Sequence, residues 1–118
     1  MYPHLNWQEI WSFKTDRFTV ICDIQPEDFS PDEHFEDQET IQMIQDGRMD
    51  WFMVRMRVLM DHRFEIGADY LGGCAYFNAS DFVKGDDRNG YFRDMVRSSL
   101  DSAREYLKKY PLPYQRAA

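Results

Sequence analysis

Alternation of apolar and polar residues marks a hairpin near the start of the chain. Trp11 and Phe13 alternate with polar neighbours, and a second alternating run follows a turn at Thr15-Asp16. We therefore predict two antiparallel strands, at residues 9–14 and 17–24.

The clearest strand pattern runs from residue 51 to residue 60, where one face should belong to the core. The core face would carry Phe52, Val54, Met56, Val58 and Met60, and the other face Trp51, Met53, Arg55, Arg57 and Leu59. A hairpin connection at residues 61–63 then leads to a fourth strand, which we expect to end at Gly72-Gly73.

Two segments have helical patterns. A short helix is predicted from residue 37 to residue 46, ended by Gly47, and a long amphipathic helix from residue 91 to residue 110, followed by prolines. Residues 78–84 suggest one further short turn of helix. The long helix should face the core with Phe92, Val96, Leu100 (or Ser99), Ala103, Leu107 and Tyr110.

The order of these elements predicts an α+β fold. It consists of an antiparallel four-stranded sheet with the long C-terminal helix packed on one face, and a short acidic helix between strands 2 and 3. The chain has 118 residues, of which 43% are hydrophobic and 16% aromatic, enough to build one core. We expect residues 1–118 to form a single domain.

Negative charge is concentrated in one stretch. Residues 23–50 hold ten carboxylates against Arg48, a net charge of −9, while the whole chain carries −7. A solvated acidic stretch can serve solubility alone, but it also suits a basic partner. The candidate partner-binding carboxylates are Asp28, Asp32, Glu33, Glu36, Asp37, Glu39 and Asp46.

The exposed face of the sheet is a second candidate binding surface. It should display Trp51, Arg55 and Arg57, together with Trp11 or its neighbours, and could dock a protein partner or a second copy in a homodimer. The alternative is that the two arginines pair across strands with carboxylates such as Asp23 or Glu65.

Known catalytic and metal-binding patterns are missing from the sequence. The three histidines are far apart, no Cys-x-x-Cys or phosphate-binding glycine loop occurs, and no activated nucleophile is evident. We expect no metal, no cofactor and no enzymatic activity. Cys22 and Cys74 should be buried, reduced thiols. An enzyme that uses Cys74 remains an alternative.

The overall charge also limits the partners. A net charge of −7 at a pI near 4.8 argues against direct binding to nucleic acid or to an anionic membrane. The sequence has no apolar run long enough to span a bilayer and no signal-peptide pattern at its beginning, so we expect a soluble, cytoplasmic protein.

The segment Asp69-Tyr70-Leu71-Gly72-Gly73-Cys74, with Asp81-Phe82 and the run from Gly90 to Met95, resembles a group of small acidic proteins from phages, prophages and plasmids of proteobacteria. The resemblance implies a mobile-element origin and a bacterial host cell. It assigns no catalytic residue.

In size, charge and source the chain is similar to DNA mimics and anti-CRISPR proteins. We therefore expect an anti-defence protein, most concretely an anti-CRISPR inhibitor. Its acidic segment would occupy the basic nucleic-acid groove of a Cas effector or restriction enzyme. The alternative is a non-enzymatic regulatory or assembly protein that docks through its sheet face.

Overall fold

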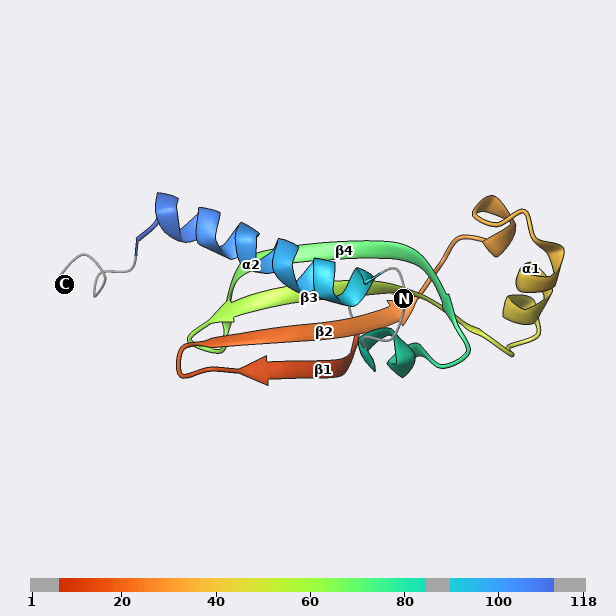
Figure 1. Cartoon of the computed structure of the whole chain (residues 1–118), viewed down its shortest axis with the longest axis horizontal. Helices are drawn as coiled ribbons and strands as arrows, with labels where there is room; N and C mark the ends of the chain where they lie inside the picture. Colours follow the sequence, from red (N-terminus) through yellow and green to blue (C-terminus); the bar gives the residue numbers. More distant parts are fainter. Residues whose placement is uncertain (1–6, 85–89, 112–118) are drawn as a thin grey trace.

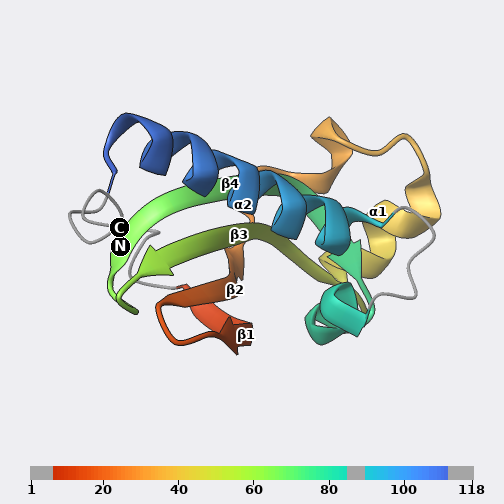
Figure 2. The ribbon, with the colours of Figure 1, turned by 60° about the vertical axis from the view of Figure 1, so that its left-hand side comes forward.

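The computed structural model describes residues 7–84 and 90–111. Four antiparallel strands form one sheet in the order β1 (Gln8–Lys14), β2 (Phe18–Pro26), β3 (Asp50–Met60) and β4 (Phe64–Tyr76). The long helix α2 (Tyr91–Lys109) lies across one face, over β4 and β3 (Figures 1 and 2). The predicted α+β architecture, with helix α1 (Gln38–Gln45) between strands 2 and 3, is confirmed.

The hydrophobic core lies between β3 and α2. Phe52, Val54, Met56 and Val58 alternate along β3, and each is at most 3% exposed. They face the helix, while the side chains between them face the opposite side of the sheet, as the sequence pattern predicted. Val20 and Cys22 of β2 extend the same core.

Helix α2 approaches the sheet closely at Gly67 of β4. A Cβ atom there would overlap the Ser99 carbonyl oxygen and lie 2.8 Å from the Ala103 nitrogen. The small side chains of Ser99 and Ala103 let the two backbones approach here, and both residues are buried, as is Met95 in the hydrophobic core. The predicted apolar stripe was partly wrong, because Tyr110 is 61% exposed.

The short 3-10 helix η3 (Ala79–Lys84) closes one end of the core. Phe82 is fully buried and contacts the rings of Phe52, Tyr76 and Phe92, with centroids 5.7 to 6.5 Å apart. The predicted turn of helix at this place is confirmed. It ties the end of β4 to the beginning of α2.

A β-bulge in β1 corrects the prediction for Trp11. The register between β1 and β2 shifts between Glu9 and Trp11, so Trp11 pairs with Cys22 on the core face. Its ring packs edge-on against Phe92 of α2, with centroids 5.0 Å apart. Trp11 therefore does not belong to the exposed face, and of the two expectations for that face, Trp11 or its neighbours, the first was wrong.

Strand β4 is longer than the sequence suggested. We predicted that it would end at Gly72-Gly73, but it continues to Tyr76. The register to β3 shifts between Phe52 and Val54, and Gly73 adopts a positive φ of 68°. Glycine tolerates this left-handed conformation, so the pair of glycines makes a bulge within the strand instead of a terminus.

Both cysteines are buried, free thiols, as predicted. Cys22 lies on β2 and Cys74 on β4, both in the core. Within the described ranges, no helix is both long and apolar enough to cross a membrane.

Candidate functional site: the acidic arm

Residues 27–49 leave the sheet between β2 and β3 and form what we call the acidic arm. It contains the 3-10 helix η2 (Pro31–Glu33) and α1. Figures 1 and 2 show that it extends beyond the end of the sheet, away from the C-terminal end of α2. It holds eight carboxylates against one arginine, a net charge of −7.

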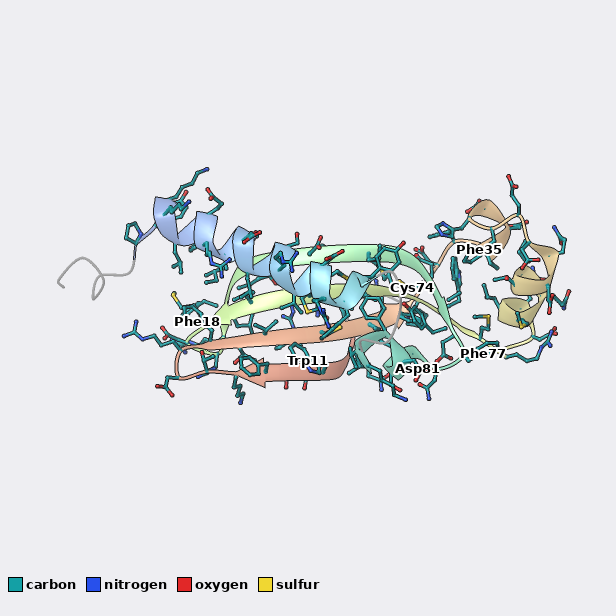
Figure 3. All side chains as sticks on the ribbon, in the orientation of Figure 1. Trp11, Phe18, Phe35, Cys74, Phe77 and Asp81 are labelled. Atoms are coloured by element: carbon teal, nitrogen blue, oxygen red, sulfur yellow. The ribbon has the colours of Figure 1, made fainter. Side chains whose placement is uncertain are left out.

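An aromatic cluster fixes the arm to the beginning of β3. The indole Nε1–H of Trp51 donates to the carbonyl oxygen of Phe29 at 2.8 Å. The rings of Phe29, His34 and Phe35 surround the indole, with centroids 5.2, 5.9 and 5.7 Å away. Phe35 lies on the side of the arm that faces the sheet (Figure 3). Trp51 therefore anchors the arm.

A second attachment joins the arm to the bulge of β4. The Gly73 N–H donates to the Glu27 carboxylate at 2.8 Å. The imidazole of His34 lies so close that a Cβ on Gly73 would come within 2.9 Å of its Cε1. The two glycines, which the sequence marked as a bend or close approach, thus provide the contact surface for the arm.

Helix α1 has its own local stabilisation. Asp37 is its N-cap and accepts hydrogen bonds from the Thr40 hydroxyl at 2.7 Å and the Glu39 N–H at 3.2 Å, and these bonds lower the pKa of Asp37. Ile41 and Ile44 are buried. Gly47 follows the helix with a φ of 77°, which fits its predicted place after the helix end.

The carboxylates predicted to bind a partner fall into two groups. Asp37 caps α1, and Asp46 accepts from Arg48 at 3.0 Å and from Gln42 at 2.7 Å, so both have local structural roles. The other five are exposed, and their side chains form no hydrogen bond or ion pair among the described residues. These five free carboxylates are Asp28, Asp32, Glu33, Glu36 and Glu39.

On the face of the sheet opposite helix α2, charged side chains pair with one another. Asp23 is 3% exposed and accepts from Arg55 at 2.9 and 2.7 Å and from Arg57 at 3.1 Å. The bond to Asp23 raises the pKa of Arg55, and the ring of Trp7 covers its guanidinium at 4.1 Å. Of the two alternatives for the arginines, the structure shows pairing with Asp23.

Sequence reasoning missed Trp7, Glu27 and the aromatic arm residues. The pairing of Arg55 with Asp23, in contrast, was among the predicted alternatives, and the strand register places the two residues opposite each other. The contacts of Phe29, His34 and Phe35 could not be read from periodicity, because the arm is irregular at that point.

The two thiols are in an environment that suppresses reactivity. Burial raises the pKa of Cys22 and of Cys74 to about 12 in each case. A thiol with such a pKa is almost entirely protonated at neutral pH, and the thiolate is the nucleophilic form. In the part of the chain that the structure describes, no group of His, Cys, Asp or Glu side chains could hold a metal ion.

No family model, curated protein or solved structure matches the chain. The geometry and charge of the arm therefore carry the functional argument.

Proposed function

We propose that the protein is a non-enzymatic binding protein whose acidic arm docks into a basic, nucleic-acid-binding groove of a protein partner. One observation carries this proposal: the five free carboxylates are exposed on an arm that is attached to the sheet at two places. Asp23, by contrast, has its partners within the fold and is not available to a second molecule.

The attachment of the arm supports binding because it limits the entropy lost on association. A disordered acidic tail would have to be ordered at the interface, whereas this segment is already held by Trp51 and Glu27. An array of carboxylates also attracts a basic groove over a distance and speeds association at low salt.

The most concrete form of the proposal is an anti-defence inhibitor that acts in the cytoplasm of a bacterial host. A Cas effector or a restriction enzyme presents the required basic groove, and the resemblance to phage and plasmid proteins favours such a partner. An anti-CRISPR inhibitor is our first choice. Docking through the sheet face has less support, because Arg55 and Arg57 are engaged with Asp23.

Neutralisation of the arm tests this proposal. The variant combines Asp32→Asn, Glu33→Gln, Glu36→Gln and Glu39→Gln. The matched control makes the same change in charge elsewhere, with Asp16→Asn, Asp94→Asn, Asp101→Asn and Glu105→Gln. Binding to purified Cas effectors and restriction enzymes is measured by calorimetry, and competition with their nucleic acid by a gel-shift assay.

We expect the arm variant to bind about tenfold or more weakly and the control variant to bind like the native protein. Native binding should also weaken between about 50 and about 300 mM salt. Melting temperatures should change little in either variant, since exposed charges contribute little to stability. Equal loss of binding in both variants, or full binding by the arm variant, would show that the arm is not the docking surface.

A further inference from the structure

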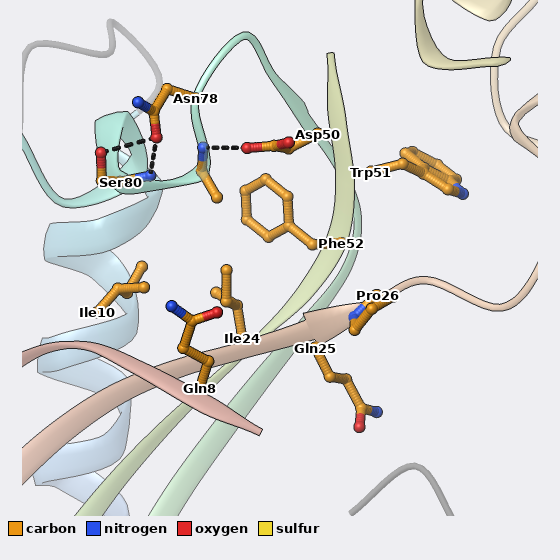
Figure 4. Close-up of a pocket in the computed structure, with 11 residues that line it drawn as sticks. Gln8, Ile10, Ile24, Gln25, Pro26, Asp50, Trp51, Phe52, Asn78 and Ser80 are labelled. Atoms are coloured by element: carbon orange, nitrogen blue, oxygen red, sulfur yellow. Dashed lines mark hydrogen bonds between the residues drawn. The ribbon is translucent and has the colours of Figure 1, made fainter. Parts of the chain in front are cut away.

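A pocket of about 350 Å³ lies where the ends of β1, β2 and β3 meet η3. Ile10, Ile24 and Phe52 form its apolar part, and Gln8, Asp50 and Ser80 lie around it (Figure 4). Its volume falls within the range of small-ligand sites in proteins. It is separate from the free carboxylates of the arm, although β3 begins where the arm ends.

The polar groups of the pocket are held in place from two sides. Asp50 accepts the Ala79 N–H at 2.7 Å through Oδ2, which fixes its carboxylate at the edge of the pocket. The Asn78 side-chain oxygen accepts from the Ser80 N–H at 3.1 Å and from its hydroxyl at 2.9 Å, and these bonds fix the turn that carries Ala79 (Figure 4). The geometry of the site thus exists before any ligand binds.

Charge selects the class of ligand. Among the described residues that line the pocket, Asp50 is the only charged one, and it is exposed. Its Oδ1 atom and the Gln8 amide have no hydrogen bond with the described residues. An anion would meet repulsion there, and a purely apolar ligand would leave the carboxylate without a new partner.

We propose that this pocket receives an arginine side chain of the protein partner. The aliphatic stem would lie against Ile10, Ile24 and Phe52, and the guanidinium would donate to Asp50 Oδ1 and to the Gln8 amide oxygen. Arginine fits better than lysine, because its planar fork of donors can meet two acceptors and is less strongly hydrated than an ammonium group. The inference rests on the proposed function, since it names a contact that a basic partner would make beside the arm.

Model compounds test the pocket without the partner. N-acetylarginine amide is titrated into the ¹⁵N-labelled protein, with the citrulline and norleucine analogues as controls. Citrulline keeps the shape of arginine but has no charge, and norleucine keeps only the apolar stem. We expect arginine to cause saturable shifts of the Ile10, Ala79 and Ser80 amides, and citrulline to bind about fivefold or more weakly. Citrulline or norleucine binding as well as arginine, or shifts that do not saturate, would overturn the proposal.

Two variants locate the binding. Asp50→Asn removes the charge but keeps an oxygen that can accept the Ala79 N–H, and it should weaken arginine binding about fivefold or more. Gln8→Phe fills the exposed entrance with a side chain that strands accept, and it should block binding even if Asp50→Asn disturbs the fold. If both variants fold and bind arginine as the native protein does, the pocket is not the site.

The failure of this inference can be told apart from the failure of the proposed function. The arm variant described above should still bind N-acetylarginine amide, because it leaves the pocket intact. Asp50→Asn should weaken partner binding while the arm remains complete. If partner binding needs the arm but is unaffected by Asp50→Asn, the pocket proposal alone is rejected. If the pocket binds arginine but partner binding does not depend on the arm, the proposed function of the arm is rejected.

Discussion

Charged side chains have opposite roles in the two regions of the molecule, the helix-covered sheet and the acidic arm. Asp23 and Glu33 lie ten residues apart in the same acidic stretch of sequence. Asp23 is buried on β2 and shared by two arginines, whereas Glu33 is exposed in η2 without a partner among the described residues. Composition alone does not distinguish them. The strand register does, because it places Arg55 opposite Asp23.

The difference shows which charges are available for binding. A carboxylate satisfied by two guanidinium groups is part of the fold, and its removal leaves unpaired charge in a poorly solvated place. A solvated carboxylate contributes little to stability and is free to meet a partner. Changes in the sheet should therefore affect stability, and charge changes in the arm should affect association.

The largest effect is expected at the contact between sheet and helix. Gly67→Val would place side-chain atoms against the backbone of α2 at Ser99 and Ala103, which cannot move aside without shifting the helix. We expect a loss of about 3 kcal/mol in the free energy of unfolding, measured by urea denaturation. Gly72→Ala is the control, because its Cβ would meet one side-chain atom, the Glu27 Oε2 at 3.2 Å, and no backbone atom. Equal losses at the two positions would show that the helix is not seated as described.

The next largest effect is expected for the buried charge. Asp23→Ala leaves Arg55 and Arg57 without their shared acceptor, and their side chains are only 16% and 23% exposed. Because this exposure allows some hydration, we expect a loss of about 2 kcal/mol instead of the larger loss typical of a fully buried pair. Asp101→Ala, which breaks an exposed pair with Arg104, should change stability by less than about 0.5 kcal/mol. Similar effects of the two substitutions would remove the distinction between internal and free charge.

The sequence predicted the architecture well because the sheet and helices follow regular periods. Strand β3 alternates from Trp51 to Val58, and α1 has both an acidic N-terminal turn and a glycine after its end. The expectations for Trp11 and for the end of β4 both failed at a bulge: in β1 the register shift puts Trp11 on the core face, and in β4 the two glycines form a bulge within the strand instead of its end. Periodicity cannot show where an extra residue is inserted.

The candidate site was only partly predictable. The acidic stretch was evident from charge alone, but its division into structural and free carboxylates depends on contacts such as those of Asp37 and Asp46. Trp51 was expected to bind a partner because strand alternation put it on an exposed face. Its ring is instead surrounded by Phe29, His34 and Phe35, which come from a segment without regular period.

A smaller effect on the free energy of unfolding should appear at alkaline pH. It should arise in the sheet, since the arm has no cysteine. The pKa of Cys22 and of Cys74 is about 12 in the folded protein, against 9.0 for an ordinary thiol. Above about pH 9 the unfolded chain releases protons that the folded protein retains, so the stabilisation present at lower pH is lost as the pH rises towards 12. Each thiol can lower stability by at most about 1.4 kcal/mol per pH unit in that range.

Replacement of both thiols checks this effect. Urea denaturation at pH 8 and at about pH 9.2 compares the native protein with the Cys22→Ala, Cys74→Ala double variant. The variant should be less stable at pH 8, because it leaves small gaps in the core, but it should lose about 1 kcal/mol less between the two pH values. Parallel losses would mean that other groups cause the alkaline destabilisation. Rapid alkylation of either native thiol at pH 7 would contradict the burial itself and favour an enzyme that uses Cys74.

The smallest effect in this series tests whether the arm opens independently of the sheet. Trp51→Phe keeps an aromatic ring among Phe29, His34 and Phe35 but removes the hydrogen bond to the Phe29 carbonyl. We expect a loss of about 1 kcal/mol, confined to the arm. In hydrogen-exchange measurements the amides of α1 should exchange faster, while those of β2 and β3 keep their rates.

Trp11→Phe is the matched control, because that indole packs against Phe92 in the core, and it should leave exchange in α1 unchanged. Equal acceleration in α1 and in the sheet after Trp51→Phe would show that arm and sheet open as one cooperative unit. The arm would then be an integral part of the domain, and its free carboxylates would be held as rigidly as the sheet itself.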